Sequence, residues 1–162
     1  MNVFICTAIK KGRYSGRLSI YYKQTLAKSV EIVETNQNGI RCVKHDKKLF
    51  SFYEDVYIIN VYVPPTNSNV IDLNNFDLFD ELETYLEKYK YLGKCLITGD
   101  FHSRCSNLEG FITFDNYLVN NNQLSNDVYI PPRVSKDHVI DMRGRRLIEL
   151  FQSTSFILSD GR

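Results

Sequence analysis

The chain has 162 residues, of which 43% are hydrophobic and 24% are charged. This composition is ordinary for a globular protein and excludes a disordered, collagen-like or low-complexity chain, while the length predicts one domain over residues 1–162. Lys and Arg number 20 against 19 Asp and Glu, so the net charge of +1 excludes a generally basic nucleic-acid surface and leaves only a local one.

Four short strands are predicted in the first third of the chain. Met1–Ile9 is an apolar run typical of a buried strand, and Gly16–Tyr22 alternates apolar and polar residues. Val30–Glu34 and Ile40–Lys44 flank the turn Thr35–Gly39, whose Asn-Gly step is a strong hairpin signal. We therefore expect an antiparallel meander.

A central strand and a helix come next. Asp55–Val63 is apolar or aromatic at almost every position, which favours a strand buried on both faces. Leu73–Leu92 carries apolar residues at steps of three and four, which predicts a helix. Asn74 or Asn75 is the expected N-cap of this helix, and Gly93 is the glycine expected just beyond its C-terminal end.

The last part of the chain mixes one strand, a long loop and a helix. Lys94–Thr98 predicts a short buried strand, and Ser106–Val139 has no long periodic segment and predicts an irregular loop. Asp141–Ser153 returns to helical spacing, and Ser155–Leu158 predicts a final strand. A meander, then strand–helix–strand, then helix–strand, predicts a mixed α/β (α+β) sandwich.

The cysteines indicate a reducing compartment. Cys6, Cys42, Cys95 and Cys105 form neither a CxxC pair nor a spacing with histidine that is typical of zinc sites. The apolar run Val3–Ile9 is too short for a signal peptide or a membrane span. We expect reduced, mostly buried thiols in an intracellular protein, nuclear or cytoplasmic, without a membrane partner.

Two residues lie at the ends of predicted strands, where catalytic and ligand-binding residues are common. Asp100 follows Gly99 at the end of a predicted strand, where a carboxylate could bind a hard cation or take a proton from water. The alternative is an aspartate that caps a turn. Tyr62 ends the central strand, so its hydroxyl could donate to a phosphate oxygen, or its ring could belong to the core.

Together these segments resemble a known superfamily. A strand that ends in Tyr62-Val63-Pro64, then a helix, then a strand and Gly99-Asp100-Phe101, is similar to the endonuclease/exonuclease/phosphatase superfamily. The resemblance is closest to the endonuclease domains of non-LTR retrotransposon (LINE-type) reverse transcriptases, and Arg143–Leu150 and Ile157–Arg162 support it. It implies a four-layered α/β sandwich of the DNase I-like type, incomplete at both ends. It also implies hydrolysis of phosphodiester bonds in DNA with Mg²⁺ or Mn²⁺.

The resemblance also implies roles for particular residues. Asp100 matches the aspartate that orients or deprotonates the attacking water, with a possible metal contact through water, and Tyr62 matches the tyrosine that contacts the scissile phosphate. His102 stands where the family has Asn, which helps to hold the phosphate. Arg104 could pair with the aspartate or with phosphate. Lys11 and Arg13 could touch DNA phosphates, or could belong to a solvated strand edge.

Other family motifs have no counterpart in the sequence. The resemblance offers no candidate for the family's metal-binding Glu or catalytic His, and His45 and His138 are expected at the surface, like the arginines of the last helix. We therefore expect a fragment with weak or no activity, attached in its full-length ancestor to a reverse transcriptase domain. Two alternatives stay open: a non-catalytic nucleic-acid or protein-binding remnant, and a phosphatase-like relative acting on small phosphoesters or inositol phosphates.

Overall fold

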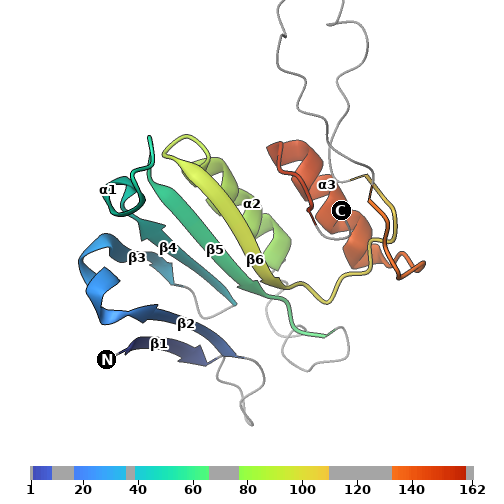
Figure 1. Cartoon of the computed structure of the whole chain (residues 1–162). Helices are drawn as coiled ribbons and strands as arrows, with labels where there is room; N and C mark the ends of the chain where they lie inside the picture. Colours follow the sequence, from blue (N-terminus) through green and yellow to red (C-terminus); the bar gives the residue numbers. More distant parts are fainter. Residues whose placement is uncertain (1, 9–16, 36–38, 66–76, 110–132, 160–162) are drawn as a thin grey trace, which may run out of the picture. The chain divides into compact units, whose positions relative to one another are not determined.

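The structure is a computed structural model that describes residues 2–8, 17–35, 39–65, 77–109 and 133–159. The chain divides into two compact units, residues 1–102 and residues 103–162. Both the single domain and the DNase I-like type remain predictions. The coarser prediction of a mixed α and β architecture is confirmed, since a four-stranded mixed sheet and helices are present (Figure 1).

The first unit contains all four strands predicted in the first third of the chain. β1 (Asn2–Ala8) pairs antiparallel with β2 (Arg17–Lys23) in a two-stranded sheet. β3 (Val30–Thr35) pairs antiparallel with β4 (Ile40–His45) in a separate sheet. The expected single meander is therefore wrong at one point: a 3₁₀ helix, η1 (Gln24–Ser29), follows β2, and the chain enters the second sheet after it.

The second sheet has the strand order β3-β4-β5-β6. β5 (Val56–Tyr62) pairs antiparallel with β4 and parallel with β6 (Lys94–Asp100). A parallel pair needs a crossover connection, which the helix α2 (Leu78–Tyr89) supplies. A short helix that the sequence analysis did not predict, α1 (Lys47–Phe50), joins β4 to β5.

The core of the first unit lies between this sheet and α2, which covers one face of the sheet in Figure 1. On β5, Tyr57, Ile59 and Val61 are buried, while the residues between them are half-buried. The Tyr57 ring packs against Tyr89 of α2, with ring centroids 4.8 Å apart. The prediction of a central strand is confirmed, since β5 lies between β4 and β6, but burial on both faces is only partly correct. The face that points to α2 is buried, and the other face is half-buried.

β6 is more exposed than its apolar sequence suggests. The side chain of Leu96 is 55% exposed, and Thr98, Gly99 and Asp100 are exposed as well. Within the described residues β6 is the last strand in the sheet order, so it has one neighbouring strand instead of two. The prediction of a buried strand over Lys94–Thr98 is wrong for this reason.

The ends of α2 also differ from the prediction. Its N-cap is Asp77, whose carboxylate accepts a hydrogen bond from the backbone N–H of Phe79 at 2.8 Å, and not Asn74 or Asn75, which lie outside the described residues. Gly93 is not a left-handed C-terminal glycine, because the helix ends at Tyr89. Glycine is needed at position 93 because the backbone there lies close to that of Asp55, and a Cβ would lie 2.2 Å from the carbonyl oxygen of Asp55.

The second unit is organised around the predicted last helix, α3 (Met142–Thr154). Asp141 caps its N-terminus and accepts from the backbone N–H of Gly144 at 2.6 Å. The predicted final strand over Ser155–Leu158 is wrong. Ser155 adopts a left-handed conformation with φ of 64°, and the N–H of Phe156 donates to the carbonyl of Phe151, which completes a helix C-cap instead of starting a strand.

The long loop predicted over Ser106–Val139 is described only in part. Residues 133–139 form no helix or strand, as expected, and residues 110–132 lie outside the described residues. An isolated bridge between Cys105 and Ile140 ties the two ends of this segment together, and the guanidinium of the buried Arg133 donates to the carbonyl of Leu108 at 2.7 Å. The described part of the loop is therefore held by specific hydrogen bonds.

Candidate functional site

The parallel pairing of β5 and β6 places two of the predicted site residues side by side. Tyr62 is the register partner of Asp100, and both lie at the carboxyl ends of their strands. The carboxyl ends of parallel strands meet at one edge of a sheet, where ligands commonly bind in open α/β sheets. The backbone N–H of Val63 donates to the carbonyl of Asp100 at 2.8 Å and extends the pairing past Tyr62.

Gly99 makes this arrangement of the backbone possible. Its φ is +145°, a conformation that residues with a side chain rarely adopt, and a Cβ at this position would lie 1.8 Å from the carbonyl oxygen of Val61. The strand can therefore approach β5 this closely only with glycine, and Asp100 follows directly. The pairing of the two strands thus requires the glycine of the Gly-Asp step.

Asp100 is held by a tight local turn with His102. The carboxylate oxygen Oδ1 of Asp100 accepts from the backbone N–H of His102 at 3.1 Å, and the ring nitrogen Nδ1 of His102 lies 3.1 Å from the same oxygen. His102 has a φ of +43°, which a non-glycine residue adopts at some strain. Its ring stands edge-on to the Tyr62 ring, with centroids 5.9 Å apart and planes at 89°.

Tyr62, Asp100 and His102 thus form one contiguous cluster, the edge cluster. The Asp100 side chain is 62% exposed, so water and ligands can reach its carboxylate. A carboxylate accepts hydrogen bonds, whereas a tyrosine hydroxyl and a histidine ring can both donate them. An acceptor for a water proton and donors for phosphate oxygens are therefore available at one sheet edge.

The edge cluster offers a divalent metal one protein carboxylate, that of Asp100. Across the described residues, no three His, Cys, Asp or Glu side chains gather in a way that could hold a metal ion. Mg²⁺ prefers six oxygen ligands and is usually held by one or two carboxylates together with water and substrate phosphates. Asp100 would hold Mg²⁺ or Mn²⁺ together with water and substrate phosphate, and this metal remains a prediction of the resemblance.

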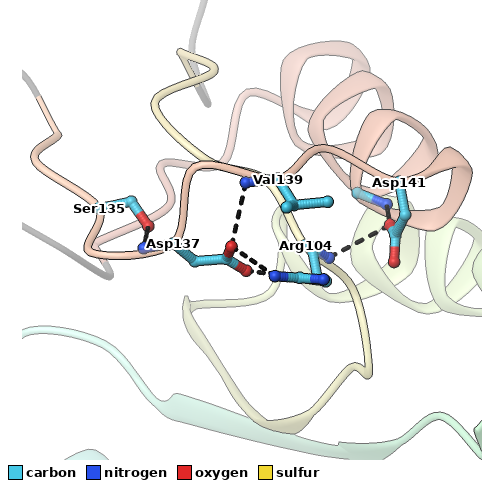
Figure 2. Close-up of polar contacts among 6 residues, drawn as sticks. Arg104, Ser135, Asp137, Val139 and Asp141 are labelled. Carbon is cyan, nitrogen blue, oxygen red and sulfur yellow. Dashed lines mark hydrogen bonds and ion pairs between the residues drawn. The ribbon is translucent and has the colours of Figure 1, made fainter.

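Arg104, the predicted phosphate contact, belongs to the second unit and is bound to another residue (Figure 2). Its Nε donates to Oδ2 of Asp137 and its Nη2 donates to Oδ1, both at 2.7 Å. This bidentate pair, chiefly through the side-chain hydrogen bond, raises the pKa of Arg104 and lowers the pKa of Asp137 to about 2. Asp137 also accepts from the backbone N–H of Val139.

The backbone of Arg104 is held separately from its side chain. The Arg104 N–H donates to the carboxylate of Asp141 at 3.2 Å, and the Asp141 N–H donates to the carbonyl of Arg104 at 3.0 Å. Gly144 permits this contact, because a Cβ there would lie 2.0 Å from the Arg104 carbonyl oxygen. The sequence did not predict Asp137 and Asp141 as partners of Arg104, because no local pattern indicates contacts between residues more than 30 positions apart.

The Asp137 carboxylate makes stability depend on pH. Its folded pKa of about 2 lies below the ordinary value of 3.8, so its ion pair stabilises the fold above that ordinary value and is lost as the pH falls towards about 2. We predict that Asp137→Asn lowers the Tm only slightly at about pH 7, because the pair is partly exposed, and that the difference from wild type shrinks below about pH 4. Thermal melts followed by circular dichroism measure this. A difference in Tm that stays constant over the whole range would contradict it.

The remaining predicted residues have mixed outcomes. Lys11 and Arg13 lie outside the described residues. His138 is exposed as expected, but His45 is half-buried, and this burial lowers its pKa. In α3, Arg145 is exposed whereas Arg143 and Arg146 are half-buried, so the expected exposed arginine face is only partly correct.

The thiols agree with the prediction where they are described. Cys42 and Cys105 are buried, Cys95 is half-buried, and these three thiols are not joined in disulfides within the described residues; the side chain of Cys6 is not described. Burial raises the pKa of Cys42 to about 12 and that of Cys95 to about 11, which leaves both thiols protonated and unreactive at neutral pH.

In the part of the chain that the structure describes, none of the helices combines the length and apolar character needed to cross a membrane. Comparisons of the chain with protein-family models, with curated proteins and with solved structures find no match.

Proposed function

We propose that the chain acts as a Mg²⁺-dependent DNA endonuclease of the endonuclease/exonuclease/phosphatase type, with slow turnover. The observation that supports this most is the register of the parallel strands β5 and β6. It sets Tyr62 beside Asp100, and both are in contact with His102. The two motifs that contain Tyr62 and Asp100 lie far apart in the sequence and thus meet at one sheet edge.

The chemistry follows from the side chains of the edge cluster. Hydrolysis of a phosphodiester needs a group that takes a proton from water and donors for the charge that develops on the phosphate oxygens. Asp100 would accept the proton of a water molecule whose oxygen attacks phosphorus, while Tyr62 and His102 would donate to the non-bridging oxygens. The P–O bond to the leaving oxygen would break, and solvent water would protonate that oxygen. A metal ion, when bound, would supply further charge stabilisation. The family's leaving-group histidine has no counterpart in this sequence, which is the reason to expect slow turnover.

A plasmid assay tests this proposal. Wild type at high concentration is expected to nick supercoiled plasmid slowly in Mg²⁺, and Asp100→Asn is expected to slow nicking by about 100-fold or more, the usual contribution of a positioned acid or base. Asp80→Asn, which removes the same charge from the exposed surface of α2, serves as the matched control and should nick like wild type. Equal nicking by Asp100→Asn, or no nicking by wild type, contradicts the proposal.

A second candidate is a non-catalytic DNA-binding remnant of the same fold. It is supported by the local turn at Asp100, because the backbone N–H and Nδ1 of His102 both lie 3.1 Å from one carboxylate oxygen. In this reading Asp100 serves mainly as a turn residue. Salt-dependent DNA binding that Asp100→Asn leaves unchanged, without nicking by either protein, would favour the remnant over the endonuclease.

A further inference from the structure

We propose that Arg104 forms a phosphate-binding site that Asp137 occupies in the free protein, and that a DNA phosphate displaces the Asp137 carboxylate from the Arg104 guanidinium. This inference rests on the proposed function only in taking DNA as the ligand. It concerns the second unit of the chain and involves no residue of the edge cluster.

The geometry of the pair is that of an anion site. Two parallel N–H donors of Arg104, on Nε and Nη2, each lie 2.7 Å from one oxygen of Asp137 (Figure 2). The planar guanidinium presents this fork of donors equally to a carboxylate and to two oxygens of a phosphate. A phosphodiester carries one negative charge, as the carboxylate does, so the exchange leaves the charge at Arg104 balanced.

The fold does not need the side-chain pair to position Arg104. Its backbone N–H and carbonyl are both hydrogen-bonded to Asp141, and Asp141 is fixed in turn as the N-cap of α3. Asp137 has its own anchors as well, since its backbone N–H donates to the Ser135 hydroxyl and its carboxylate accepts from Val139. The guanidinium can therefore change partners while both backbone segments keep their hydrogen bonds.

The pair is also open to an incoming ligand. The side chains of Arg104 and Asp137 are 53% and 40% exposed. Ion pairs at such exposed positions contribute little net free energy, because water solvates both charges well when they separate. A polyanion that presents many phosphates can then compete with one carboxylate. Asp137 lowers DNA affinity in two ways, since it occupies the fork and repels the phosphate.

The test measures binding without cleavage. A fluorescein-labelled duplex of about 20 base pairs is titrated in EDTA at roughly 50 mM salt and followed by anisotropy. Asp137→Asn is expected to bind about three- to tenfold more tightly than wild type, with a salt slope steeper by about one phosphate contact. Glu149→Gln, an exposed position on α3, makes the same change in net charge and is expected to gain less than about twofold.

A double variant distinguishes the effect of the two-donor geometry of the Arg104 guanidinium from the effect of net charge. Arg104→Lys combined with Asp137→Asn keeps the net charge of Asp137→Asn but loses the two-pronged donor, so its affinity should fall back to that of Glu149→Gln. A melting curve for each variant reports folding. The inference is overturned when Asp137→Asn gains no more than Glu149→Gln, or when the double variant keeps the full gain of Asp137→Asn. The binding assay does not depend on cleavage or on Asp100. The phosphate-site proposal and the endonuclease proposal can therefore be contradicted independently of each other.

Discussion

Gly99→Ala is expected to destabilise the first unit by on the order of 3–5 kcal/mol, the sum of backbone strain and overpacking. Ala at this position would have to adopt a φ of +145° while its Cβ lay 1.8 Å from the carbonyl oxygen of Val61. The obstacle is backbone, which cannot rotate away as a flexible side chain could. Relief requires β6 to separate from β5 at the end where Tyr62 and Asp100 are paired. Urea unfolding followed by circular dichroism measures the loss.

Thr98→Ala is the matched control for this variant. Thr98 precedes Gly99 on the same strand and its side chain is exposed, so the change to Ala should alter stability by less than about 1 kcal/mol. The same two variants separate stability from function, since residual folded Gly99→Ala should nick plasmid no better than Asp100→Asn. A midpoint of urea unfolding equal to that of Thr98→Ala would show that β6 tolerates a side chain at Gly99.

Leu86→Ala is expected to destabilise the first unit by about 2–5 kcal/mol, the usual loss for a buried leucine. The Leu86 side chain is fully buried in α2, on the face of the helix that also buries Leu82 and Tyr89. Removing its three outer carbon atoms leaves a cavity that the β-sheet and helix backbones cannot close. The midpoint of urea unfolding should fall without a large change in slope, because the native fold is retained.

Leu96→Ala is the control with the same chemistry and different burial. Leu96 lies on β6 with more than half of its side chain exposed, so the same three carbon atoms leave no cavity and the loss should stay below about 1 kcal/mol. Equally small losses for the two leucines would mean that α2 does not form the core of the first unit. Equally large losses would mean that Leu96 is covered in solution.

Local pattern was sufficient to predict most of the secondary structure. The helices α2 and α3 were correctly identified because each has an apolar pattern with the helical period of 3.6. The strand β5 was correctly identified because it is apolar or aromatic at almost every position. The ends of elements were less predictable. The apolar run Phe156–Leu158 resembles a strand, but a strand forms only where another strand can pair with it. Here the backbone N–H of Phe156 is already hydrogen-bonded in the C-cap of α3.

The burial of particular residues could not be predicted from local sequence pattern either. The sequence Lys94–Thr98 reads as a buried strand, but burial depends on which elements lie on each side. In the described sheet β6 has a neighbour on one side only. Arg41 is the opposite case, since its charge is typical of exposed residues and yet it is 3% exposed, on the interior strand β4. Hydrophobicity predicts the average position of a residue type and not the neighbours of a particular residue.

The sequence by itself determined the mixed α and β class, most element positions and the residues Tyr62 and Asp100 as candidates, since all of these depend on short-range pattern. Only the tertiary structure decided that the two residues are register partners, that His102 contacts both, and that Arg104 is bound by Asp137. The reason is physical: a strand's register and an ion pair are set by packing between segments far apart in the chain, and that packing leaves no local signal in the sequence.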